Sequence, residues 1–257
     1  MLPDALFWNV HMYGIMVAVG ILACFAVLYL YSKKLGVEAK LVDFCFYDGV
    51  FSILVGFGAA ALVQATLNYI ENPEQGFRFG SGITVVPGLI GGAGFFLIVY
   101  FLLRKRMKLH LLEILPVIPC CITVAHGFGR IGCFFAGCCY GRETTSIFGV
   151  HFKTVSGNRL PTQLFEAVFL FVLFAALTLL ILKWKCPYTL SVYLVAYGIF
   201  RFIIEFYRDD DRGQFFGSTL SPSQVGSIVY LLLGVGWFFL HRYLLTRRTP
   251  PEEGTPA

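Results

Sequence analysis

Residues 161–182 read PTQLFEAVFLFVLFAALTLLIL, and Glu166 is the only charged side chain in this run. A membrane-spanning helix needs about 20 predominantly apolar residues, so the run is long enough to cross a bilayer. The proline at its start suits the first turn of a helix, where a missing N–H costs no hydrogen bond. The run therefore predicts a membrane-spanning helix, with Gln163 and Glu166 in its first turns.

Six further apolar runs occupy residues 11–31, 42–67, 83–103, 110–128, 188–207 and 222–241. Of the 257 residues, 57% are hydrophobic and 14% are charged, against about 45–50% and 25% in globular proteins. This excludes a soluble enzyme, a disordered chain and a disulfide-stapled secreted domain. We predict an all-α polytopic membrane protein with seven transmembrane helices. The third run opens with TVVPGLIGGAGFF, so its first turns are expected to be broken or re-entrant.

Basic residues follow the first, third, fifth and seventh runs: Lys33, Lys34, Lys40, Arg104, Lys105, Arg106, Lys108, Lys183, Lys185, Arg242, Arg247 and Arg248. By the positive-inside rule, the N-terminus is expected outside and the C-terminus in the cytoplasm. No basic segment or cleavage site precedes the first run, so it is expected to be a retained anchor. Residues 1–245 are expected to form one transmembrane domain and 246–257 a disordered cytoplasmic tail. The net charge of +5 forms no basic stripe, so no nucleic-acid partner is expected.

Residues 126–142, HGFGRIGCFFAGCCYGR, hold the densest group of reactive side chains. We expect this segment to leave the fourth run at the outer membrane boundary. Arg130 then lies at membrane depth, where an arginine costs at least about 2.5–3.5 kcal/mol unless it has a partner. A guanidinium grips a phosphate through two parallel hydrogen bonds, which favours a functional role. The alternative is an interfacial arginine that reaches lipid headgroups.

A second group lies in residues 198–208, GIFRFIIEFYR. Arg201 and Glu205 are four residues apart, so they share a helix face and can pair. They form either a structural ion pair or, with the arginine of the previous segment, a clamp for one anionic headgroup. Glu166 is either a partner for an arginine or a proton acceptor, and pairing is favoured because a carboxylate beside an arginine stays ionised. Tyr13 is either a site residue at headgroup level or part of the aromatic belt.

Three of the eight cysteines, Cys133, Cys138 and Cys139, are expected on the outer side, near His126. A disulfide could persist there if the compartment is oxidising. The spacing C-x4-C-C matches no standard zinc pattern, so no metal and no cofactor is expected. A structural disulfide, small packing residues and active-site thiols remain open.

Five pieces of the chain together resemble the prolipoprotein diacylglyceryl transferase family. Residues 126–142 resemble its signature loop, whose core reads G-R-x-G-N-F-x-N-x-E-x-x-G. The other four agree in order and spacing with family motifs: Tyr13-Gly14 (Y-G), Gly88-Leu-Ile-Gly91-Gly92 (H-G-G-L-I-G), 159–166 (R-H-P-S-Q-L-Y-E) and 201–208 (R-F-x-x-E-F-x-R). The resemblance implies seven helices with an outside N-terminus, in agreement with the charge distribution.

The resemblance also implies a reaction in the bacterial inner membrane, at a site facing the outer leaflet. The thiol of a lipobox cysteine in a prolipoprotein attacks the glyceryl carbon of phosphatidylglycerol, the diacylglyceryl group moves to sulfur, and glycerol phosphate leaves. Such a site needs cations for the phosphate, a base for the thiol and a cleft open to membrane lipids. By motif match, Arg130 and Arg201 hold the phosphate while Glu166 and Glu205 orient them. The other expected substrate-binding residues are Tyr13, Gly88, Gly91, Gln163, Cys133 and Cys138.

The chain departs from the family pattern where thiol activation is expected. The family's histidine before G-G-L-I-G falls on Val86, its two asparagines fall on Cys133 and Ala136, and its glutamate falls on Cys138. His126 is the histidine close in sequence to the signature loop, and we consider it as the replacement base. Two further hypotheses stay open. One is a phospholipid-dependent transferase with another acceptor, and the other is a non-enzymatic thiol or redox membrane protein.

Overall fold

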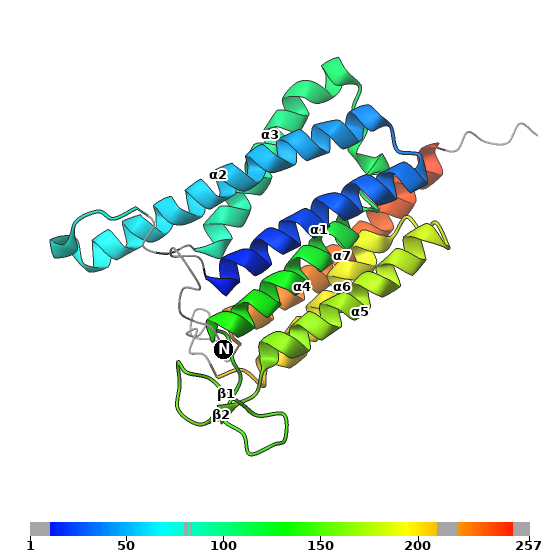
Figure 1. Ribbon diagram of the computed structural model, residues 1–257. Helices are drawn as coiled ribbons and strands as arrows, with labels where there is room; N and C mark the ends of the chain where they lie inside the picture. The colour runs from blue at the N-terminus through cyan, green and yellow to red at the C-terminus, as the bar shows by residue number, and fades with distance from the viewer. Residues whose placement is uncertain (1–10, 80–81, 83, 210–219, 249–257) are drawn as a thin grey trace, which may run out of the picture. The chain divides into compact units, whose positions relative to one another are not determined.

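The computed structural model describes residues 11–79, 82, 84–209 and 220–248. This part of the chain contains seven α-helices, and six of them are long and apolar enough to cross a membrane. The remaining helix, α6, has 17 residues. The elements are α1 (Met12–Leu35), α2 (Ala39–Glu71), α3 (Val85–Met107), α4 (Ile118–Ala136), β1 (Val150–His151), β2 (Asn158–Arg159), α5 (Thr162–Leu182), α6 (Thr189–Glu205) and α7 (Pro222–Arg248) (Figure 1). The prediction of a mostly helical polytopic membrane protein is confirmed.

The predicted start of the fourth span, at residue 110, is wrong. Residues 111–113 form a short 3-10 turn, and α4 begins only at Ile118. Two prolines explain the displacement, because proline disrupts a helix interior but fits its first turn. Pro116 lies before the helix and Pro119 lies within its first turn.

The far end of α4 is displaced in the same direction. Gly137 ends the helix in the left-handed conformation, with φ of 70°, and its N–H bonds to the carbonyls of the preceding turn. His126, Arg130 and Cys133 therefore lie on α4 itself. The predicted end of the fourth span, at residue 128, is therefore wrong.

The expectation of broken first turns in the third run is also wrong. α3 is a continuous helix from Val85, and Pro87 is accommodated in its first turn. The small residues of this segment permit close packing against α2 instead. A Cβ added to Gly88 would lie 3.0 Å from Ala60 Cβ, and one added to Gly91 would lie 2.8 Å from Ala59 Cβ.

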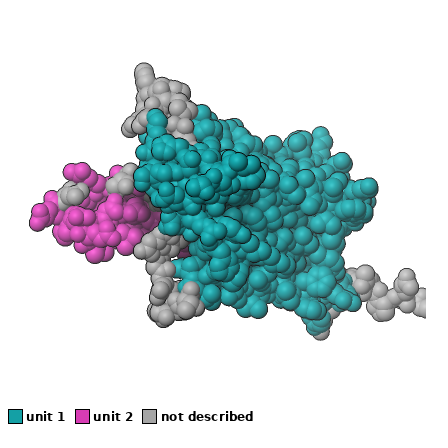
Figure 2. Space-filling view, turned by 90° about the horizontal axis from the view of Figure 1, so that it is seen from below, with its two compact units in different colours: residues 1–34, 115–257 teal, residues 35–114 magenta. Residues whose placement is uncertain are grey.

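The chain divides into two compact units (Figure 2). Unit 2 comprises residues 35–114 and consists mainly of the packed pair α2 and α3. Unit 1 comprises residues 1–34 and 115–257, with α1 and α4 to α7. Within unit 1, α4 packs on α5, α5 on α6, and α6 on α7. The expected tail lies outside the described residues from 249 onward, and α7 extends to Arg248.

Five helices of unit 1 bring their polar ends together. α4 and α6 finish at the end of the unit where α5 and α7 begin, and the N-terminal turn of α1 packs there against α4. The connection from α4 to α5 carries the antiparallel pair β1–β2, with Val150 opposite Arg159. These two short strands are absent from the all-α prediction. The same connection is tied to the end of α6 by a bridge between Gly141 and Arg208.

Candidate functional site

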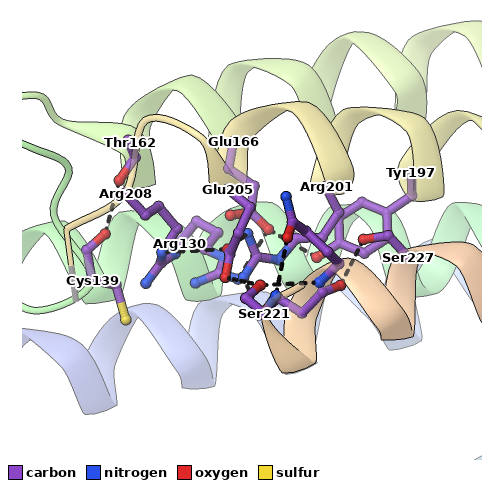
Figure 3. Close-up of polar contacts among 12 residues, drawn as sticks. Arg130, Cys139, Thr162, Glu166, Tyr197, Arg201, Glu205, Arg208, Ser221 and Ser227 are labelled. Carbon is purple, nitrogen blue, oxygen red and sulfur yellow. Dashed lines mark hydrogen bonds and ion pairs between the residues drawn. The ribbon is translucent and has the colours of Figure 1, made fainter. Parts of the chain in front are cut away.

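Glu166 is the centre of a buried polar cluster at this end of unit 1. It lies in the second turn of α5, and its side chain is fully buried. One carboxylate oxygen, Oε1, accepts hydrogen bonds from Arg130 Nη2 at 2.9 Å and from the Tyr197 hydroxyl at 2.9 Å (Figure 3). The prediction that this carboxylate pairs with an arginine is confirmed. An ionised carboxylate is stable in the apolar interior only with such compensation.

His126 approaches the same carboxylate from α4. Its Nε2 lies 3.6 Å from Glu166 Oε1, and its ring packs edge-on against Tyr197 with 5.2 Å between centroids. His126 and Arg130 are four residues apart, so they project from one face of α4 toward α5 and α6. Tyr197 is a site residue that the sequence interpretation missed, because it stands among other aromatic residues of an apolar run.

Arg201 forms a second buried ion pair on α6. Its Nη1 lies 2.8 Å from Glu205 Oε2, and both side chains are 8% exposed. Its Nη2 donates to Ser223 Oγ of α7 at 2.9 Å. The predicted pairing of Arg201 with Glu205 is confirmed. The charges of Arg130 and Arg201 both act on Glu166, so the two arginines contribute to one cluster.

The start of α7 completes the support of Glu205. Ser221 Oγ donates to Glu205 Oε1 at 2.8 Å and accepts the N–H of Gln224 at 3.2 Å. The Gln224 side chain in turn accepts the N–H of Ser221 at 3.0 Å. This reciprocal arrangement is a capping box, and its sequence signature, Ser-Pro-Ser-Gln at 221–224, is readable in the chain. The sequence interpretation overlooked it.

Arg208 brings a third guanidinium group to the same end of the unit. It follows α6, its side chain is 2% exposed, and its Nε lies 4.0 Å from Glu205 Oε2. The backbone at this point allows no space for an added side chain. A Cβ on Gly141 would lie 2.5 Å from the carbonyl oxygen of Tyr207. Close pairing of the two segments thus holds Arg208 beside the connection from α4 to α5.

Three thiols gather where α4 ends. The sulfur atoms of Cys133, Cys138 and Cys139 all lie within 4.8 Å of one another, and all three cysteines are free. Cys138 is exposed, whereas the other two are partly buried. The neighbouring Cys133 and Cys138 thiols, together with the Arg208 guanidinium, lower the pKa of Cys139. Within the described ranges, no other group of three or more His, Cys, Asp or Glu side chains has metal-binding geometry.

Three side chains, one between β1 and β2 and two at the start of α5, hold the backbone of this thiol loop, residues 137–139. Thr154 Oγ1 donates to the carbonyl of Gly137 at 2.7 Å, and Thr162 Oγ1 donates to that of Cys139 at 2.9 Å. Gln163 Nε2 donates to the carbonyl of Cys138. The other amide atom of Gln163, Oε1, is buried and has no hydrogen-bond partner among the described residues. Gln163 was expected to bind substrate. In the structure its Nε2 positions the thiol loop, and its Oε1 is a hydrogen-bond acceptor that no described residue uses.

The remaining predicted site residues lie in different places. The Tyr13 ring packs against α4, where a Cβ added to Gly132 would lie 3.1 Å from it, beside the thiol loop. Gly88 and Gly91 belong to unit 2, where they allow the close contact between α2 and α3. Unit 1 thus gathers His126, Arg130, Cys133, Cys138, Gln163, Glu166, Arg201, Glu205 and Tyr13.

Comparisons with known proteins give the same family as the motifs. Residues 4–240 match the family described as prolipoprotein diacylglyceryl transferase. A relative from Clostridium tetani named phosphatidylglycerol–prolipoprotein diacylglyceryl transferase is 34% identical, covering 91% of this chain and 94% of the relative. A relative with the corresponding name from Clostridium perfringens is 34% identical, covering 88% of this chain and 89% of the relative. One from Francisella tularensis subsp. novicida is 32% identical, covering 88% of this chain and 87% of the relative. The chain belongs to the prolipoprotein diacylglyceryl transferase family.

Proposed function

We propose that this protein transfers the diacylglyceryl group of phosphatidylglycerol to the lipobox cysteine of prolipoproteins. The relatives carry this activity in their names, and the buried cluster around Glu166 supplies groups suited to it. The observation that carries the proposal is the state of Arg130. Its Nη2 is held by Glu166, while its Nε is buried and has no hydrogen-bond partner among the described residues.

An arginine held in this way is prepared for a phosphate. The ion pair fixes the plane of the guanidinium, and the unused N–H can donate to an oxygen of the phosphodiester. Arg201 provides a second cation, oriented by Glu205 and Ser223. Both cations would stabilise the charge that grows on the phosphate as the bond to the glyceryl carbon breaks. The same proposal includes substrate-binding roles for Tyr13, Gln163, Cys133 and Cys138 of unit 1. For Gly88 and Gly91 of unit 2, substrate binding stays a separate prediction.

The proposed reaction is a displacement at carbon. The acceptor sulfur forms a bond to the terminal glyceryl carbon, the bond from that carbon to the phosphate oxygen breaks, and glycerol phosphate leaves with the electron pair. The thiol proton must pass to a base. We assign this role to His126, because Val86 replaces the family's histidine and because His126 Nε2 lies 3.6 Å from Glu166 Oε1 within the buried cluster.

We further propose that all seven helices cross the bacterial inner membrane and that the site faces its outer leaflet. Basic residues lie at the opposite end of unit 1 from the site. Lys33 and Lys34 are in the last turn of α1, and Lys183 follows α5. By the positive-inside rule, this distribution supports a cytoplasmic position for that end, with the N-terminus outside and the C-terminus inside.

A transfer assay tests this function directly. The purified protein is incubated in detergent micelles with phosphatidylglycerol labelled in its acyl chains and with a lipobox peptide. Labelled peptide and stoichiometric glycerol phosphate are the expected products. Release of glycerol phosphate without peptide labelling would indicate another acceptor. Neither product, with redox activity of the thiols, would overturn the enzyme assignment.

A substitution of His126 tests the proposed base. His126→Gln should lower the transfer rate by about 100-fold or more, because general base catalysis contributes about 10²–10⁴-fold. Binding of phosphatidylglycerol should persist, since both arginine pairs remain. His151→Gln, at the exposed position of β1, is the matched control and should transfer normally. An unchanged rate in His126→Gln would remove this residue from the mechanism.

A further inference from the structure

Cys133, Cys138 and Cys139 together have the features of a built ligand site, beyond the substrate-binding roles proposed for Cys133 and Cys138. Three sulfur atoms converge from two separate turns of chain, one at the end of α4 and two beyond its cap. Three soft donors around one point are typical of a site for a thiophilic cation such as Zn²⁺. A disulfide would use two of the sulfurs and leave the third without a function.

The sulfur spacing matches such a cation closely. Zn–S bonds of about 2.3 Å in tetrahedral geometry place the sulfur atoms about 3.8 Å apart. The three sulfurs lie within 4.8 Å of one another, so each pair needs to close by at most about 1 Å. Small rotations about the Cα–Cβ bonds of the three cysteines can supply a shift of this size.

The backbone holds the sulfurs in position. Cys139 adopts a left-handed conformation with φ of 64°, which is uncommon for a residue with a side chain and costs on the order of 1–3 kcal/mol. The hydrogen bonds from Thr162, Gln163 and Thr154 to the loop carbonyls maintain this conformation. Strain that is maintained by three separate hydrogen bonds indicates that the direction of the side chain matters.

The surroundings provide charge balance and access. Three thiolates around a divalent cation carry one net negative charge. The Arg208 guanidinium interacts electrostatically with Cys139 and would compensate that charge, as groups around metal ligands commonly do. Cys138 is exposed, so an ion can reach the sulfurs without opening the helices.

We propose that Cys133, Cys138 and Cys139 bind one thiophilic divalent cation, Zn²⁺, as a three-thiolate site with an open fourth position. Catalytic zinc sites have this composition of three protein ligands and one exchangeable position. Resting on the proposed function, the class of ligand for the fourth position is the thiolate of the acceptor cysteine. The cation would then hold the acceptor sulfur as a thiolate once its proton has passed to the proposed base.

Metal binding to the full-length protein tests the site. The protein in detergent is reduced, freed of reductant and titrated with Co²⁺, whose sulfur-to-cobalt absorption reports thiolate ligands. One Co²⁺ per chain, displaced by Zn²⁺, is expected. Cys138→Ser and Cys139→Ser should each weaken binding by at least about 100-fold, since loss of a supporting group alone costs 10–100-fold. Cys186→Ser, between α5 and α6, is the matched control and should bind Co²⁺ normally.

Thiol counting provides a second measurement that needs no variant. Zn²⁺ should protect three of the eight cysteines of the folded protein from maleimide. If two of the thiols are already unavailable for labelling before metal is added, a disulfide is present and the proposal is overturned. Co²⁺ binding that persists in both Cys138→Ser and Cys139→Ser would also overturn it. Transfer activity by a protein that binds no metal would refute the metal site alone. Metal binding without any transfer would refute the proposed function and leave the site standing.

Discussion

Arg130→Lys should lower kcat/KM for diacylglyceryl transfer by about 100- to 1,000-fold, the loss expected when one preorganised donor to a developing charge is removed. Lysine keeps the positive charge and can still pair with Glu166. It lacks the planar fork, so it cannot hold the carboxylate and a phosphate oxygen at the same time. Steady-state kinetics with labelled phosphatidylglycerol measures the change.

The control for this variant is another arginine replaced in the same way. Arg104 lies in the last turn of α3, where it contacts the ring of Phe101, and it has no part in the Glu166 cluster. Arg104→Lys should leave the transfer rate within about twofold, as expected for a surface substitution. Normal turnover in Arg130→Lys would refute bidentate recognition of the phosphate by this residue.

Glu166→Gln should destabilise the protein by about 3–5 kcal/mol, because it leaves the buried Arg130 guanidinium without its counter-ion. The amide retains an oxygen that can accept the hydrogen bond from the Tyr197 hydroxyl. The loss of stability therefore reports the charge of the side chain and not its shape. Chemical unfolding in detergent measures the change. Glu71→Gln, at the exposed end of α2, should change the stability by no more than about 0.5 kcal/mol.

A double variant separates this ion pair from general damage to the core. Arg130→Met with Glu166→Leu removes both charges and replaces them with apolar side chains. Replacing both partners of a buried pair is often neutral, so the double variant should unfold at lower cost than the two single variants together. Simple additivity of the two single effects would show that the charges do not interact.

Local patterns account for the part of the site that the sequence predicted. Arg201 and Glu205 are four residues apart on one helix, so their pairing follows from helical geometry alone. The capping box at 221–224 is equally local and was readable, although its contact with Glu205 was not. Arg130 and Glu166 belong to different helices, and residue type indicated only that each needs a partner.

The errors in the predicted spans have a common cause. Hydropathy responds to apolar residues whether or not they are helical, so it included residues 110–117 in the fourth span. The prolines at 116 and 119 and the glycine at 137 decided the true limits through backbone geometry. The extension beyond residue 128 places Arg130 and Cys133, like His126, in a helix that packs against α5.

The sequence by itself determined that the chain enters the membrane as a series of apolar helices, because hydropathy and helical periodicity are properties of neighbouring residues. It also identified the side chains that cannot remain alone in that environment. The tertiary structure decided which of them meet. The packing of α4, α5, α6 and α7 brings Arg130 to Glu166, Tyr197 to the same carboxylate and Ser221 to Glu205. Such contacts join distant segments, and only the folded arrangement of the helices specifies them.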